Sequence, residues 1–224
     1  MTTVATNQPN NQVAGARQPN LSVHPVAPQY RYNLASRRYV DAGGRFVSGE
    51  RVRQAVDQVV VRSNDQIQTT SRRLQSGEIS LAQWQSQMMQ QMKVLHVANG
   101  LAGLGGSKLA SQADYGYIGQ LVKQQYQYLN QFAKDIATRV ELLDKSFPSR
   151  VKLYAEAARG TYHSVQTRAE RLAGRTQAKR VLGPADHCPG CVEQAGKGWQ
   201  PIEEVAPIGS QQCLTNCHCS IEFE

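Results

Sequence analysis

The chain has 224 residues, enough for a sizeable hydrophobic core, although its apolar share of 40% is a little low. It contains no run of about 18 apolar residues, and its opening residues lack the charged and apolar regions of a signal peptide. These features argue against a membrane partner and predict a soluble protein that no cleaved signal secretes. The formal net charge of +8 favours an anionic partner such as nucleic acid but does not establish one.

The first part of the chain predicts little helix. Residues 1–29 are rich in Asn, Gln, Pro, Thr and Val, contain no acidic residue and show neither a helical nor a strand period. We interpret them as a disordered or partner-ordered arm. Residues 30–47 contain two aromatic and basic runs on either side of Gly43 and Gly44, which can supply the positive φ of a tight turn. A short β-hairpin is therefore predicted there.

Residues 48–180 predict a helical body, because apolar side chains recur there at helical spacing. The predicted starts are Ser48, Ser80 with Gln83 in a capping box, Ser111 with Asp114 in the first turn, and Pro148; the predicted stops are Gly77, the run 100–106 and Gly174. The fold class is therefore mainly α, a bundle of about four amphipathic helices. The Met and Tyr residues on the apolar stripes, together with His96 and His163, are interpreted as core residues.

Much of the positive charge lies between residues 150 and 180, where eight basic side chains face two acidic ones, a net charge of +6. The simplest interpretation is a solvated helix face. The alternative is a surface that contacts nucleic-acid phosphates or an acidic partner. The candidate contact residues are Arg168, Arg171, Arg175, Lys179 and Arg180.

All five cysteines lie in residues 181–224, which we interpret as a small Cys-rich module resembling a zinc knuckle. They are Cys188, Cys191, Cys213, Cys217 and Cys219. A structural Zn²⁺ site takes two ligands from one tight turn and two from another, so the first-choice set is Cys188, Cys191, Cys213 and Cys217, with Cys219 as the competing fourth. Strand alternation turns His218 away from the side that Cys217 and Cys219 share. Buried thiols or disulfides remain the alternative.

Catalysis is weakly supported by the sequence. A redox CxxC needs a helix after its first thiol, and Gly196, Gly198 and Pro201 predict that any helix there ends within about two turns. The histidines form neither the HxE motif of zinc deaminases nor the HExxH motif of metalloproteases, and residues 103–108 lack the GK[ST] ending of a phosphate-binding loop. We therefore expect no enzymatic activity, with thiol exchange as the least favoured reading.

The cysteine-rich tail resembles the C-terminal motif of phage Mu F-like minor head proteins, also called head morphogenesis proteins. The resemblance rests on residues 180–191, residues 198–202 and the closing CLTNCHC of residues 213–219. The family motif closes with HPxCxC; here the histidine is absent and Cys213 stands one residue farther out, which leaves the third ligand open. Residues 44–48, 77–84 and 125–132 are also similar to stretches of phage head-associated proteins.

This resemblance implies a virion protein of a tailed-phage head, inside the capsid or near the portal and assembled in the host cytoplasm. Its implied partners are capsid or portal proteins, with packaged DNA or a second copy of the chain as further candidates. The alternative from a different class is a DNA-binding protein that uses the basic C-terminal helix and the zinc module on the phosphate backbone. In either case Zn²⁺ is the expected cofactor and has a structural role.

Overall fold

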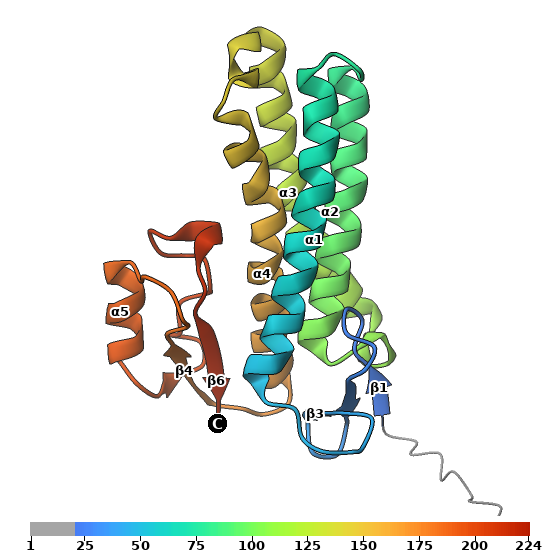
Figure 1. The fold of residues 1–224 in the computed structure, drawn as a ribbon. Helices are drawn as coiled ribbons and strands as arrows, with labels where there is room; N and C mark the ends of the chain where they lie inside the picture. Colours follow the sequence, from blue (N-terminus) through green and yellow to red (C-terminus); the bar gives the residue numbers. More distant parts are fainter. Residues whose placement is uncertain (1–20) are drawn as a thin grey trace, which may run out of the picture.

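The computed structural model describes residues 21–224, apart from the side chains of Val140 and Glu141. Long helices form an upright bundle, a small sheet lies at one end of it, and a compact C-terminal module lies against its side (Figure 1). The arm predicted for residues 1–29 falls largely on residues 1–20, which lie outside the described residues. Within the part of the chain that the structure describes, the fold class is mainly α, as the sequence predicts.

The bundle consists of α1 (Gly49–Gln75), α2 (Leu81–Leu104), α3 (Gln112–Thr138) and α4 (Phe147–Leu172). The predicted N-caps are confirmed, since the side chains of Ser48, Ser80 and Ser111 each accept a hydrogen bond from a first-turn backbone N–H group. Capping boxes close with Gln83 in α2 and Asp114 in α3. Helices α2 and α4 each pack against the other three helices and also against one another.

Aromatic and sulfur-containing side chains fill the centre of the bundle. Trp84 is completely buried, lies within 6.1 Å of Phe132 and 5.7 Å of Phe147 between ring centroids, and donates a 3.0 Å hydrogen bond to Ser71. The interpretation of the methionines as core is confirmed, because Met88 and Met92 are fully buried. His96 and His163 are buried as well, in agreement with their predicted place in the core.

The predicted stop within residues 100–106 is confirmed, because α2 continues to Leu104 and ends at Gly105, whose φ is +100°. The two preceding glycines serve helix packing instead of helix termination. A Cβ at Gly103 would lie 2.2 Å from the carbonyl oxygen of Tyr162 on α4, and one at Gly100 would lie 2.8 Å from Ile118 on α3. Glycine is required there because neighbouring helices approach so closely.

The N-terminal sheet contains β1 (Leu21–Val23), β2 (Arg31–Asn33) and β3 (Arg38–Val40), paired antiparallel in that order. The expectation of no strand in residues 1–29 is therefore wrong at β1, which is too short to show a period. The hairpin predicted within residues 30–47 is present, but β2 and β3 are joined by residues 34–37. The predicted glycine turn follows β3 and is closed by a bridge between Val40 and Phe46.

This sheet covers one end of the bundle. Tyr32 and Tyr39 pack with Val52 of α1, Ala102 of α2 and Tyr162 of α4 in one apolar cluster. The Tyr39 hydroxyl donates a 2.6 Å hydrogen bond to the Ala102 carbonyl, which satisfies the only polar atom of a buried ring. The sheet is therefore part of the same packed unit as the helices.

The C-terminal module consists of β4 (Gln177–Val181), α5 (Pro189–Gly196), β5 (Gln200–Pro201) and β6 (Ser220–Phe223), with β4 between β5 and β6. The boundary predicted at residue 180 is therefore wrong. The segment after α4 extends into the module as its central strand, because β6 supplies four antiparallel partners for residues 178–181. Those partners lie far ahead in the sequence, out of reach of a local pattern.

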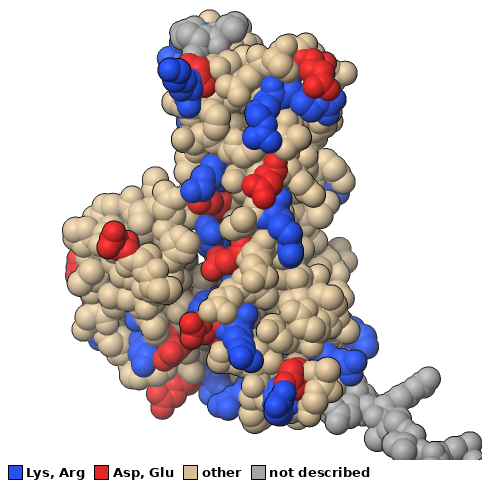
Figure 2. All heavy atoms as spheres, viewed as in Figure 1, with Lys and Arg blue, Asp and Glu red and all other residues tan. Residues whose placement is uncertain are grey.

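Charges of both signs are interspersed on the face shown in Figure 2, and no large area is purely basic there. None of the helices in residues 21–224 is long and apolar enough to cross a membrane. The module lies beside α4, which contacts β6 and the 3-10 turn Leu214–Asn216 of the module (Figure 1).

Candidate metal centre

Two turns bring the cysteines together. Cys188 is the N-cap of α5 and Cys191 lies in the first turn of that helix, with its backbone N–H donating to the Cys188 carbonyl at 3.0 Å. Cys213 and Cys217 flank the 3-10 turn Leu214–Asn216, and Cys219 directly precedes β6. The strands β4 and β6 hold the two turns at the same end of the module, as a zinc knuckle requires.

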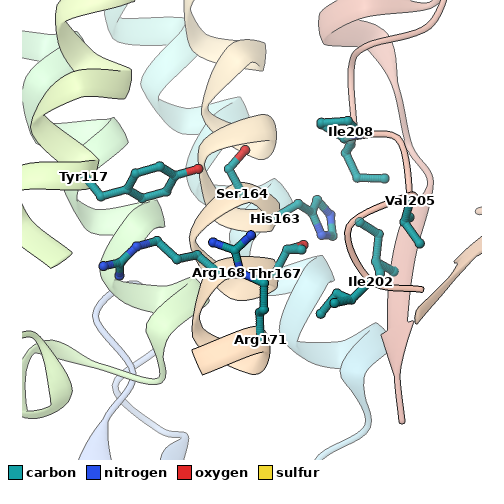
Figure 3. Close-up of a pocket in the computed structure, with 11 residues that line it drawn as sticks. Tyr117, His163, Ser164, Thr167, Arg168, Arg171, Ile202, Val205 and Ile208 are labelled. Atoms are coloured by element: carbon teal, nitrogen blue, oxygen red, sulfur yellow. The ribbon is translucent and has the colours of Figure 1, made fainter. Parts of the chain in front are cut away.

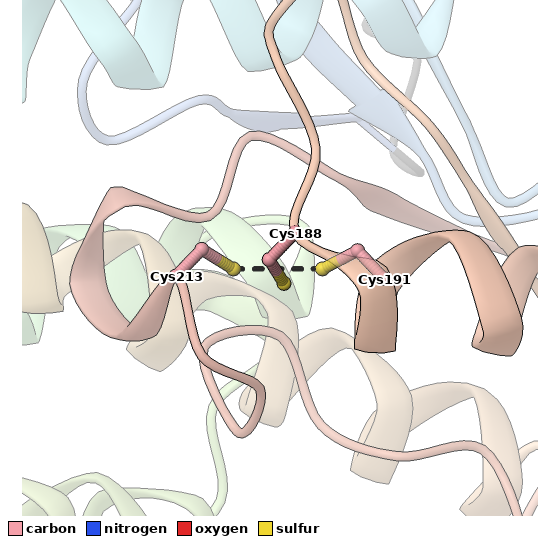
Figure 4. A group of neighbouring side chains, drawn as sticks. All are labelled: Cys188, Cys191 and Cys213. Atoms are coloured by element: carbon pink, nitrogen blue, oxygen red, sulfur yellow. Dashed lines mark hydrogen bonds between the residues drawn. The ribbon is translucent and has the colours of Figure 1, made fainter.

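The sulfur spacing fits a tetrahedral thiolate site. The Sγ of Cys191 lies 3.5 Å from that of Cys213 (Figure 4). It also lies 3.8 Å from that of Cys217. Sulfurs at the corners of a tetrahedron, about 2.3 Å from a zinc ion, lie about 3.8 Å apart. The sulfurs form two groups, and within each group all sulfurs lie within 4.8 Å of one another. One group is Cys188, Cys191 and Cys213, and the other is Cys191, Cys217 and Cys219. Cys191 belongs to both groups, so it is the centre of the cluster.

All five predicted ligand residues are therefore brought together, and strand alternation separates His218 from them as predicted. Cys217 and Cys219 are buried, whereas His218 between them is exposed. All five cysteines are free thiols in this structure, and the sulfur separations exceed the roughly 2.05 Å of a disulfide bond. The cysteines also form part of the module core with Ala178 and other apolar side chains.

The thiols of the cluster differ in their pKa values because their surroundings differ. Burial opposes ionisation of Cys188, yet hydrogen bonds from the backbone N–H groups of Cys191 and Cys213 outweigh it and lower the pKa of Cys188 to about 7. Burial, and then hydrogen bonding with neighbouring thiols, raises the pKa of Cys191. Burial likewise raises the pKa of Cys213, to about 11. Sulfurs this close resist ionising together unless a cation lies among them, which is what a metal ion supplies.

Arg180 was predicted to contact phosphate or an acidic partner, and its position rules this out. Its side chain is 2% exposed on the central strand β4. One guanidinium nitrogen lies 3.7 Å from the Sγ atoms of both Cys191 and Cys217. The other donates to the carbonyl oxygens of Ala206 at 2.5 Å and Pro207 at 3.0 Å. Arg180 is thus part of the cysteine site.

The remaining basic candidates do not form one free surface. Arg168 pairs with Asp114, Arg175 lies 3.7 Å from Glu170, and Lys179 lies 3.0 Å from Glu222. Arg171 is exposed and has no acidic partner among residues 21–224. Three of the five candidates therefore pair with carboxylates, and Arg180 is buried, so the candidates do not form a continuous basic surface.

A helix follows the CxxC motif, which overturns the structural reason for disfavouring redox chemistry. The glycines do not prevent α5, since Gly196 is its last residue and the helix is complete in eight residues. Cys188 at its start has the N-terminal position that lowers thiol pKa values. The crowding of Cys191 by further cysteines, however, differs from an isolated redox pair and favours metal binding.

His187 is a neighbour of the site that the sequence did not single out. Its Nε2 lies 2.7 Å from the Gly183 carbonyl and donates to it, which leaves Nδ1 as an acceptor 3.6 Å from the Cys219 Sγ. A histidine directly before a CxxC motif was the available signal. Its contact with Cys219 depends on the return of the chain at β6, which no local pattern reveals.

The module meets the bundle along α4, across a pocket of about 360 Å³ (Figure 3). Ile202, Val205 and Ile208 project from the module toward His163, Ser164 and Thr167 on α4. Ile202 is buried and lines this interface. Trp199, by contrast, is 43% exposed and has Lys179 4.7 Å from its ring centroid.

The fold and the site define a helical-bundle protein with a cysteine-rich C-terminal module that is arranged to hold a metal ion. No family model, curated protein or solved structure matches the chain.

Proposed function

We propose that residues 177–224 form a structural zinc module that fixes the end of the chain against the helical bundle. The observation that carries this proposal is the buried cluster centred on Cys191, with sulfur separations of 3.5 and 3.8 Å. An all-cysteine donor set matches closed structural zinc sites, whereas catalytic zinc sites keep a position for water. The same donors argue for a structural protein and against an enzyme.

The zinc ion would be held by Cys188, Cys191, Cys213 and Cys217, with Cys219 as the competing fourth ligand. When bound, it would add its binding free energy to the folding of a module that has a small core of its own. The positive charge of the ion would also balance the negative charge of the thiolates, which lie too close together to ionise at the same time without it.

We further propose that the protein is a structural component of a tailed-bacteriophage head, inside the capsid or near the portal. The support for this is the resemblance of residues 180–219 to the C-terminal motif of Mu F-like minor head proteins. A long bundle with a firmly attached terminal module suits a protein that acts by contact with capsid or portal subunits.

Metal analysis of the purified full-length chain tests the module, with one zinc ion per chain expected. Mass spectrometry of purified phage particles tests the location, with the protein expected among the virion components. A chain without bound metal would contradict the first proposal, and particles without the protein would contradict the second. The two measurements fail independently of each other.

A DNA-binding role is the second candidate. The observation that favours it is the side chain of Arg171, which is exposed and has no acidic partner among the described residues. Binding through phosphates weakens steeply as salt is raised. We expect an Arg171→Gln variant to bind duplex DNA less tightly and with a shallower salt dependence if this role holds. No binding by the parent at low salt would remove the candidate.

Thiol exchange is tested with the same protein. Insulin reduction by the parent, lost in a Cys188→Ser/Cys191→Ser variant, would replace the structural proposal with a redox one. Absence of activity in the parent is the result we expect.

A further inference from the structure

A buried positive charge lies beside the cysteine cluster with no carboxylate to balance it. The Arg180 side chain is 2% exposed, and its partners within residues 21–224 are two sulfurs and two backbone carbonyls. Its Nε has no hydrogen-bond partner in the part of the chain that the structure describes. The partly buried arginines of α4, Arg159 and Arg168, each have a carboxylate within reach.

Burial of an unpaired guanidinium costs several kcal/mol, and arginine stays protonated under all ordinary conditions. Backbone carbonyls solvate such a group but do not neutralise it. The neighbouring groups that can carry the missing negative charge are the sulfurs of Cys191 and Cys217, each 3.7 Å from the same guanidinium nitrogen. Neutral thiols would leave the charge uncompensated.

We infer that Arg180 is the charge-balancing partner of a metal-thiolate centre, donating hydrogen bonds to the thiolates of Cys191 and Cys217 and thereby setting how tightly the module holds zinc. The inference rests on the proposed zinc module. Four thiolates around one Zn²⁺ carry a net charge of −2, and the buried guanidinium halves it. Arg180 is thus a positioning residue that acts on the metal through its ligands.

The inference also narrows the ligand set. Hydrogen bonds from the guanidinium are strongest when Cys191 and Cys217 are both thiolates, because charged acceptors bind a cation better than neutral sulfurs do. The inference therefore assigns both to the ligand set, whichever of the remaining cysteines complete it. Cys191 is the residue that the two groups of cysteines share, and Cys217 lies 3.8 Å from it.

The rival explanation is that Arg180 only fills space and ties the loop at Ala206 and Pro207 to β4. Two substitutions separate charge from packing. Arg180→Lys keeps the positive charge, while Arg180→Gln keeps a hydrogen-bond donor and removes the charge. Lys179→Met is the matched control, because it removes a cation from the same strand on the side where Lys179 pairs with Glu222.

Zinc affinity of the full-length variants would be measured by competition with a chromogenic chelator. We expect Arg180→Gln to weaken zinc binding on the order of ten- to a hundredfold, the range found for outer partners of metal ligands, and Arg180→Lys to lose less. Lys179→Met should match the parent. Should Arg180→Gln fail to fold with excess zinc, the comparison of Arg180→Lys with Arg180→Met takes its place.

Cobalt substitution supplies a readout that packing alone would not move. Loss of the cation makes the thiolates better electron donors, so the thiolate-to-cobalt charge-transfer band should move to longer wavelength in Arg180→Gln and stay in place in Lys179→Met. Equal affinities and spectra across the Arg180 series would overturn this inference and leave the zinc module standing. A parent chain that binds neither Zn²⁺ nor Co²⁺ would overturn both.

Discussion

Arg168 on α4 forms an ion pair with Asp114, the residue whose carboxylate also closes the capping box of α3. One carboxylate oxygen accepts hydrogen bonds from the backbone N–H and hydroxyl of Ser111, and the other receives the guanidinium. The start of α3 is thereby fixed to the side of α4. A residue predicted to face an external anion instead joins two helices of the bundle.

Replacement of Asp114 by Ala should destabilise the bundle by about 2 kcal/mol, because the change removes a helix cap and leaves the partly buried Arg168 without its counter-charge. Urea denaturation followed by circular dichroism would measure this. Ser111→Ala removes the cap alone and should cost about 1 kcal/mol. Equal losses in the two variants would show that the ion pair contributes nothing.

Serine substitution of single cysteines should distinguish the cysteines that bind the metal from the one that does not. We expect Cys191→Ser to abolish stoichiometric zinc binding, because Cys191 belongs to both groups of neighbouring donors. Cys219→Ser should retain one zinc ion per chain, because the Cys219 sulfur lies 3.6 Å from His187 Nδ1 as an alternative partner. Metal analysis of each variant decides the set. Zinc loss in Cys219→Ser together with retention in Cys213→Ser would reverse our choice of fourth ligand.

Removal of the metal with a chelator should loosen the module and leave the bundle folded, because the two have separate cores. Hydrogen exchange would show faster exchange in β4 and β6 with little change in α1 to α4. The chain has two tryptophans, one in each region, so fluorescence offers a second test. We expect the chelator to change the tryptophan fluorescence of the parent. This change should vanish in Trp199→Phe, which keeps only the buried Trp84. Simultaneous melting of the bundle would contradict the expectation.

Acid should destabilise the bundle through His96. Burial lowers the pKa of His96 to about 4, below its ordinary value of 6.5, so the unfolded chain takes up the proton first as pH falls. The stabilisation is complete above pH 6.5 and is lost between that value and about 4. This residue alone should lower the free energy of unfolding by about 2 kcal/mol between pH 7 and pH 5.

Urea denaturation at the two pH values would measure this loss, and His96→Gln should show a correspondingly smaller one. His218→Gln changes an exposed histidine and serves as the control. His24 and His163 act in the same direction, because burial lowers their pKa values to about 4 and about 3. Some acid sensitivity should therefore remain in the His96 variant, and an unchanged pH dependence would contradict the prediction.

The parts of the fold that the sequence predicts are those determined by local chemistry. Ser80 and Gln83 predict the start of α2 because their reciprocal hydrogen bonds need only neighbouring residues. The exposure of His218 follows from the alternation of side chains along extended backbone. The cysteine cluster could be predicted for the same reason, since its donors come in two short runs.

The parts that could not be predicted depend on distant partners. Residues 177–181 follow a helix and carry basic side chains, yet they form a strand because β6 pairs with them. The role of Arg180 follows from that strand, since only the sheet turns its side chain toward Cys191 and Cys217. Gly100 resembles a helix stop in the sequence, but in the structure it lies inside α2, where the close approach of Ile118 requires a glycine.

The central place of β4 in its sheet also sets an order of events during synthesis. All four bundle helices are complete by Leu172, whereas both neighbours of β4 and every cysteine emerge from the ribosome afterwards. Domains generally fold as units in the order in which they are made. The bundle would therefore fold while residues 177–181 still lack their partner β6, and zinc would bind only after Cys213, Cys217 and Cys219 have emerged.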